Sequence, residues 1–246
     1  MAHPEYQSLA AELAELLGLQ HAPLAITFSD RAPEGVAPFN EPMPPAGSDG
    51  RTGRVSAGCV FWMKGETDTF TTVAEDHANC SVGSLTHGFK SLDEVGENAD
   101  VAALLESGWV RMEMVPQIPV VASRARHVTY GPLARIPVDP DVVFLRINAK
   151  QAMVLSDALP GLRFEGKPQC HIIPIAKEQG EVAVSVGCML SRVRTGMPNT
   201  DMTCAMPARR LAEIVDALKE TCRADKAVAA YASQDAGRFS RQAPRA

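Results

Sequence analysis

The chain has 246 residues, of which 46% are hydrophobic and 22% charged, and its net charge is −5. This is the composition of a folded globular protein that is long enough to bury a substantial core. Because 24 basic residues face 29 acidic ones, no basic surface is expected for nucleic acid, and no run approaches the roughly eighteen apolar residues that span a membrane. We therefore expect neither nucleic acid nor a membrane as a partner.

The N-terminal residues Met-Ala-His-Pro-Glu-Tyr lack the basic and apolar regions of a secretory leader, so a cytoplasmic location is expected. In such a reducing compartment, cysteines are thiols or metal ligands rather than disulfides. The chain has six of them: Cys59, Cys80, Cys170, Cys188, Cys204 and Cys222.

Apolar periodicity predicts a helix over 5–18 that ends at Gly18, and then a short buried strand over 23–28. The proline-rich and glycine-rich stretch 36–53 is expected to be a long loop. A strand-to-helix passage over 55–64 and a strand over 67–73 follow. Further on we expect a helical region over 91–106 and extended segments over 116–122 and 128–136.

In the C-terminal part, the clearest buried strand is 142–147, followed by a helix over 149–159 that Asn148 can cap. A helical turn over 170–177 is limited by Pro174, and strands are expected over 182–186 and 202–205. Pro207 is expected to open the strongest amphipathic helix, and 241–246 should form a flexible tail.

These elements predict one α/β domain over 1–240, a mixed sheet with flanking helices. Two similar halves, about 10–130 and 131–222, are conceivable because each contains an apolar strand followed by a pair of cysteines. Cys59 and Cys80 are 21 positions apart, and Cys170 and Cys188 are 18 apart. No high-identity repeat accompanies this pattern, so coincidence is the alternative.

The segment 76–88 concentrates chemistry, since it holds His77, Cys80 and His87 between Asp76 and Gly88. If it begins a helix, Asp76 or Asn79 can cap it, and the unpaired N–H groups of the first turn favour a thiolate. His77 and Cys80 are three positions apart and share a face of a helix.

The chain has no C-x-x-C pair and no H-E-x-x-H motif, which excludes the common zinc and ferredoxin motifs. A dispersed metal site remains, built from Cys59, Cys80, Cys170 and Cys188, with His77, His87 and His171 as alternate ligands. An iron–sulfur cluster or zinc would suit thiolates. The alternative is that these cysteines only fill the core, as we expect for Cys204 and Cys222.

For catalysis, the minimal arrangement is Cys80 as nucleophile with His77 or His87 as base. Arg192 follows Cys188 by four positions, so on a helix it could hold an anionic ligand or stabilise the Cys188 thiolate. A surface arginine is the ordinary alternative. No phosphate-binding glycine motif is present.

Several short motifs resemble the uncharacterised bacterial and archaeal family of domain of unknown function 169. They are Leu16-Leu17-Gly18-Leu19 with Pro23-Leu24-Ala25-Ile26, Ala57-Gly58-Cys59-Val60-Phe61-Trp62, Asp76-His77-Ala78-Asn79-Cys80-Ser81-Val82-Gly83, Pro140-Asp141-Val142-Val143 with Asn148–Met153, and Gly187-Cys188 through Arg192. The resemblance covers most of residues 10–220. It implies a shared α/β fold and cysteines at positions 59, 80, 170 and 188, and it implies no reaction.

Our leading hypothesis is a metal centre, most plausibly iron–sulfur, that joins the four cysteines for redox or Lewis-acid chemistry. A small-molecule substrate or an electron partner is expected, and a homo-oligomer is conceivable. One rival is a metal-free thiol enzyme using Cys80 and His77. The other is a non-enzymatic ligand-binding module.

Overall fold

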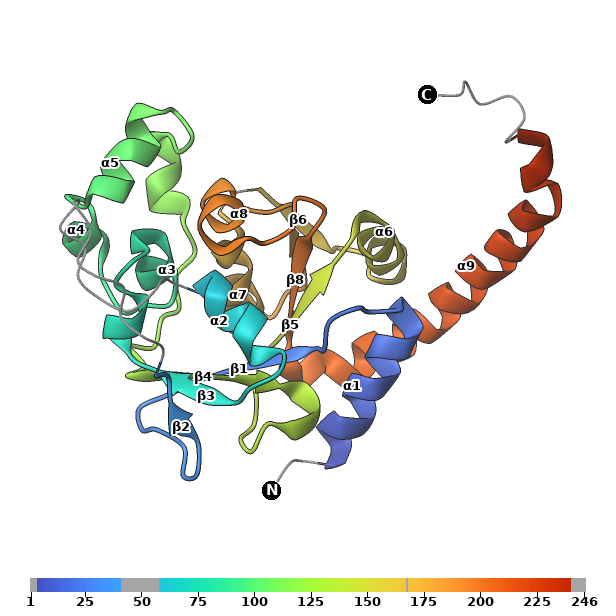
Figure 1. Ribbon diagram of the computed structural model, residues 1–246, viewed down its shortest axis with the longest axis horizontal. Coiled ribbons are helices and arrows are strands. Elements are labelled where there is room, and N and C mark those ends of the chain that lie inside the picture. The colour runs from blue at the N-terminus through green and yellow to red at the C-terminus, as the bar shows by residue number, and fades with distance from the viewer. Residues whose placement is uncertain (1–3, 41–57, 167, 240–246) are drawn as a thin grey trace.

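The computed structural model describes residues 4–40, 58–166 and 168–239 (Figure 1). The expected tail 241–246 and most of the expected loop 36–53 lie outside these ranges. The described start of that loop contains a two-residue strand, β2.

The helices are α1 Pro4–Leu17, α2 Gly58–Gly65, α3 Ser81–Thr86, α4 Leu92–Val95, α5 Ala99–Glu106, α6 Ala149–Ala158, α7 Ile172–Pro174, α8 Met189–Thr195 and α9 Leu211–Phe239. Short 3₁₀ turns lie between them: η1 Ala74–His77, η2 Met112–Gln117, η3 Leu133–Arg135, η4 Gln169–His171 and η6 Ala208–Arg210. A π-helical turn, η5 Ile175–Gln179, continues α7. The strands are β1 Leu24–Ser29, β2 Ala37–Pro38, β3 Phe70–Thr72, β4 His127–Pro132, β5 Val142–Ile147, β6 Arg163–Glu165, β7 Ala183–Ser185 and β8 Met202–Pro207.

All described strands form one eight-stranded mixed sheet in the order β2-β3-β4-β1-β5-β8-β7-β6. The edge pairs β2·β3 and β6·β7 are parallel, and the other neighbours are antiparallel. Helices flank this sheet, which confirms the predicted α/β class with a mixed sheet.

The two halves of the sheet have the same internal strand order: from its outer edge to the centre, each half places its second, third, fourth and first strand in turn. The first four strands run β2-β3-β4-β1 toward the centre, and the last four run β6-β7-β8-β5. The registers also correspond: Leu24 lies opposite Pro132 in the first half, and Val142 lies opposite Pro207 in the second. At the centre, Ala25 of β1 faces Val143 of β5 across an antiparallel pair. The two halves therefore share one topology and meet at β1 and β5.

The sheet is buried on both faces, which explains why its central strands are continuously apolar. Alternate side chains point to opposite faces. Ala25 and Val143 contact the core formed with α1, α6 and α9, whereas Leu24 and Phe144 contact the core formed with α2, α3 and α7. The segments that carry the four candidate cysteine ligands all belong to this second face.

Local signals set several boundaries as predicted. Helix α1 ends before Gly18, which adopts φ 61°, a left-handed conformation that glycine tolerates. The Asn148 side chain accepts a hydrogen bond from Gln151 N at 3.0 Å, and Gln151 Oε1 accepts one from Asn148 N at 2.8 Å. This reciprocal capping box starts α6.

One boundary was predicted wrongly, and one segment differs at its start. Pro207 ends β8 instead of opening a helix, and α9 begins at Leu211 after the turn η6. In the predicted extended segment 116–122, the first two residues belong instead to η2, and the rest forms no strand of the sheet. Helix α9 continues far beyond Cys222, and its C-terminal half extends away from the body (Figure 1). In the described chain, no helix is long and apolar enough to cross a membrane.

Candidate functional site

Four of the six cysteines line one narrow pocket: Cys59, Cys80, Cys170 and Cys188. Each comes from the start of a helical segment. Cys59 is the second residue of α2, Cys80 is the N-cap of α3, Cys170 lies in η4 just before α7, and Cys188 is the N-cap of α8. Each half of the sheet supplies two of them, through segments that flank β3 and β7. The predicted quartet is thus brought together by the fold, and we call this cavity the cysteine pocket.

Cys80 itself caps α3, so the expected capping by Asp76 or Asn79 was wrong. Its backbone is extended, and its sulfur accepts a hydrogen bond from Gly83 N at 3.4 Å. Asp76 instead accepts one from Val73 N at 2.9 Å within the preceding 3₁₀ turn. The sulfur therefore faces a backbone N–H group at a helix start.

Burial dominates the ionisation of these thiols. It raises the pKa of Cys59 to about 11 and that of Cys80 to about 12. It also raises the pKa of Cys170 well above its ordinary value, and the neighbouring cysteines add to this. Burial raises the pKa of Cys188 too, although backbone amides, including that of Ser191, act in the opposite direction. As free groups, these cysteines are protonated at neutral pH.

Two polar side chains lie beside Cys59 that the sequence did not indicate as part of the site. Gln169 and Ser191 both act to lower its pKa through hydrogen bonding, and both are almost fully buried. Gln169 Oε1 has no hydrogen-bond partner among the described residues. Neither residue belongs to a recognisable motif, so only the fold reveals their place beside the thiols.

Asp100 is a further buried group that supports the pocket. Its carboxylate accepts hydrogen bonds from Ser81 N at 3.0 Å and Ser81 Oγ at 2.6 Å. Asn98 Nδ2 donates to the same hydroxyl at 2.8 Å. Because Ser81 is the first residue of α3, Asp100 anchors the helix start that carries Cys80. The separation of nineteen positions between the partners hid this contact in the sequence.

His77 and His87 lie in an aromatic cluster beside the sheet and do not line the cysteine pocket. His77 Nε2 hydrogen-bonds Thr72 Oγ1 at 3.0 Å, and its Nδ1 has no hydrogen-bond partner in the described chain. His87 Nδ1 bonds the Gly83 carbonyl at 2.9 Å, and its Nε2 bonds the Tyr130 hydroxyl at 3.2 Å. Neither nitrogen of His77 is hydrogen-bonded to Cys80, as a nucleophile–base pair requires.

His171 follows Cys170 and lines a second, larger cavity, not the cysteine pocket. Burial lowers its pKa to about 4, so its imidazole is neutral at pH 7. Its Nε2 is buried and has no hydrogen-bond partner within the described ranges.

Arg192 donates from Nη2 to the carbonyls of Val186 at 2.9 Å, Asn199 at 3.2 Å and Asp201 at 2.9 Å. It therefore ties down the loops around α8, while its charge acts to lower the pKa of Cys188. Arg194, which the sequence did not single out, lines the cysteine pocket and approaches the Asn79 carbonyl.

The remaining two cysteines lie elsewhere. Cys204 is fully buried in β8, in the core on the opposite face of the sheet. Cys222 lies on α9 and donates its S–H to the Leu16 carbonyl at 3.3 Å. Within the described part of the chain, no three His, Cys, Asp or Glu side chains are arranged so that they could hold a metal ion.

The fold and the site together define an α/β protein whose two topologically similar halves contribute four cysteines to one pocket. A family model described as uncharacterised ArCR, domain of unknown function 169, matches residues 12–217, and the chain belongs to this family. This confirms the resemblance seen in the sequence. The comparisons with curated proteins and with solved structures gave no match.

Proposed function

We propose that Cys59, Cys80, Cys170 and Cys188 bind a metal centre, an iron–sulfur cluster with zinc as the alternative. The centre would serve redox or Lewis-acid chemistry on a small molecule. The observation that carries the proposal is the shared pocket: four cysteines spread over 130 positions line one cavity, whereas the other two lie outside it.

The electrostatics of the cysteine pocket support a cation. Burial makes an isolated thiolate costly, as the raised pKa values of Cys59 and Cys80 show. Yet backbone N–H groups from Gly83 and from the start of α8 are directed at the sulfurs of Cys80 and Cys188, where they favour negative charge. A bound cation resolves this opposition because it compensates the thiolates in the buried site. N–H···S contacts also tune the reduction potential of iron–sulfur clusters.

The arrangement bears on which metal is bound. Four thiolates around one zinc, with Zn–S about 2.3 Å, have sulfurs about 3.8 Å apart. The thiols of the described chain are not gathered in this way. A cluster contains several atoms and spaces its ligands more widely, which is why it leads the proposal. The free space between the cysteines is about 30 Å³, so the pocket must widen to accept a cluster.

The metal-free thiol enzyme is less well supported. Its nucleophile, Cys80, has a pKa raised to about 12, and its base, His77, is hydrogen-bonded to Thr72. A ligand-binding module has a specific observation in its favour, the large cavity lined by His171.

All six cysteines are free, which fits the reducing cytoplasm that we include in the proposal.

The test is metal analysis of protein purified without oxygen. We expect brown protein that contains iron and acid-labile sulfide. Cys80→Ser should lose most of the metal, whereas the matched control Cys222→Ser should retain it because Cys222 lies on α9, outside the pocket. Equal metal content in the two variants, or metal-free wild-type protein, would contradict the proposal. If the purified protein contains zinc and no iron, the proposed centre is a single zinc ion instead of a cluster.

A further inference from the structure

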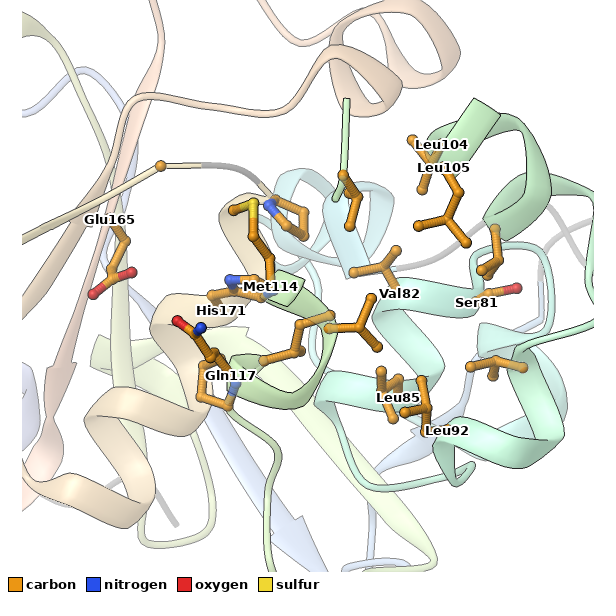
Figure 2. Close-up of a pocket in the computed structure, with 18 of the residues that line it drawn as sticks. Ser81, Val82, Leu85, Leu92, Leu104, Leu105, Met114, Gln117, Glu165 and His171 are labelled. Atoms are coloured by element: carbon orange, nitrogen blue, oxygen red, sulfur yellow. The ribbon is translucent and has the colours of Figure 1, made fainter. Parts of the chain in front are cut away.

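A second cavity, separate from the cysteine pocket, has a volume of about 370 Å³, within the range of small-molecule sites. It lies where α3, α5 and η2 of the first half face β6 and η4 of the second (Figure 2). Figure 2 shows aliphatic side chains along one side, including Val82, Leu85, Leu104 and Leu105. Such a wall favours a ligand with an apolar body.

The two charged side chains that line the opposite side of the cavity, Arg163 and Glu165, form an ion pair. Arg163 Nη2 lies 2.6 Å from Glu165 Oε1. Arg163 Nη1 donates to Glu181 at 2.9 Å and to Gln179 at 2.6 Å. Because Arg163 is shared between Glu165 and Glu181, this wall offers no free cation for an anionic ligand, and a cationic ligand would have to compete with Arg163 for Glu165.

His171 supplies an unsatisfied hydrogen-bonding group on the same side (Figure 2). Its Nε2 is buried without a hydrogen-bond partner in the part of the chain described. An unsatisfied buried polar group destabilises the folded protein, and a ligand that pairs with this nitrogen once the ring turns toward the cavity would relieve that cost. A hydroxyl suits this nitrogen in either tautomer because it both donates and accepts.

We propose that this cavity binds an uncharged, mainly aliphatic small molecule whose single hydrogen-bonding group pairs with His171. The ligand lies beside the cysteine pocket, since Val82 and Pro168 line both cavities. Its role as substrate of a metal centre rests on the proposed function, whereas its binding does not.

Calorimetric titration of the full chain with three eight-carbon probes tests the head group. We expect 1-octanol to bind at one saturable site. Octanoate and octylamine should bind at least about tenfold more weakly, because octanoate meets no free cation and octylamine must displace Arg163 from Glu165. His171→Phe should weaken octanol binding about tenfold, corresponding to the loss of one hydrogen bond. Octanoate or octylamine binding as tightly as octanol would overturn the proposal.

Blocking variants test the location. Val115→Trp fills the cavity from η2, and Leu105→Trp fills it from α5; both should abolish octanol binding. Met112→Trp is the matched control, since Met112 lies on η2 with 65% of its surface exposed and does not line the cavity. Octanol binding that survives both blocking variants would contradict the inference. If the protein binds octanol but contains no metal, only the proposed metal centre is refuted. If it contains metal but does not bind octanol, only this inference is refuted.

Discussion

His87 shows how burial changes the behaviour of a single residue. It is fully buried between Gly83 and Tyr130, and desolvation lowers its pKa from 6.5 to about 4. Between these values the unfolded chain binds more protons than the folded one, so stability falls as the pH drops from 6.5 toward 4. The stability that depends on a neutral His87 is fully present above pH 6.5 and is lost as the pH falls toward 4.

We expect this histidine to cost the folded state about 2 kcal/mol between pH 7 and pH 5. His87→Gln keeps a hydrogen-bonding side chain but cannot titrate, so its loss of stability over this range should be smaller by about that amount. Urea unfolding at the two pH values measures the difference. From pH 7 to pH 8 the two proteins should change in parallel, and equal losses below pH 7 would refute the assignment.

Burial also explains why the ionisation of Cys80 differs from the expectation based on the sequence. Its position at a helix start was predicted correctly, and that position favours a thiolate. The sequence does not show that Cys59 and Cys188 lie nearby, or that the site is buried, and burial raises the pKa of Cys80 to about 12. Motif reasoning singled out Cys80 as a candidate, but the charge state of its thiol depends on neighbours distant in the chain.

At the scale of elements, helix α3 depends on Asp100 for its start. Asp100→Asn retains one acceptor oxygen but directs an amide at the two donors of Ser81, so we expect a loss of about 1–3 kcal/mol in the free energy of unfolding. The looser helix start should also speed alkylation of Cys80 in chelator-treated protein, measured by iodoacetamide labelling and mass spectrometry.

The matched control for this change is Asp93→Asn, because Asp93 is exposed in the first turn of α4. It should leave both the stability and the Cys80 alkylation rate nearly unchanged. Indistinguishable behaviour of the two variants would show that Asp100 does not anchor α3.

Elements whose signals are local were predictable, and those that depend on distant partners were not. Asn148 and Gln151 start α6 through contacts three positions apart, and this boundary was predicted correctly. Pro207 carried an equally local helix signal, but pairing with Val142 of β5 places it in a strand. Tertiary pairing overrode the local preference.

For the whole molecule, a partly buried ion cluster joins the two halves. Arg146 of β5 contacts Glu66 at 2.9 Å and Asp201 at 2.7 Å, and its side chain is only 8% exposed. His21 also bonds Glu66 at 2.9 Å. Residues before β1, after α2 and before β8 are thereby held together.

Arg146→Met should destabilise the protein by about 3 kcal/mol or more, because it leaves two largely buried carboxylates without their cation. Adding Glu66→Gln and Asp201→Asn should restore part of this loss. Arg223→Met, which removes an exposed pair with Glu220, should cost less than about 1 kcal/mol. Urea unfolding of the four proteins is the measurement, and equal effects of Arg146→Met and Arg223→Met would contradict the role of the cluster.

At this scale the sequence predicted the α/β class and the set of four cysteines, but not the strand order that unites them. In the sequence, the similarity between the two halves appeared only in the spacing of the cysteine pairs. Register, such as Ala25 opposite Val143, arises from side-chain packing on both faces of the sheet, which periodicity does not specify.

The division of the four thiols between the halves has a consequence for biosynthesis. The ribosome releases Cys59 and Cys80 long before Cys188, which follows the seventh strand in the chain. A nascent polypeptide therefore exposes an incomplete set of sulfurs until most of its second half has emerged. Any group that requires all four must be inserted late, and a prematurely terminated product would be unable to receive it.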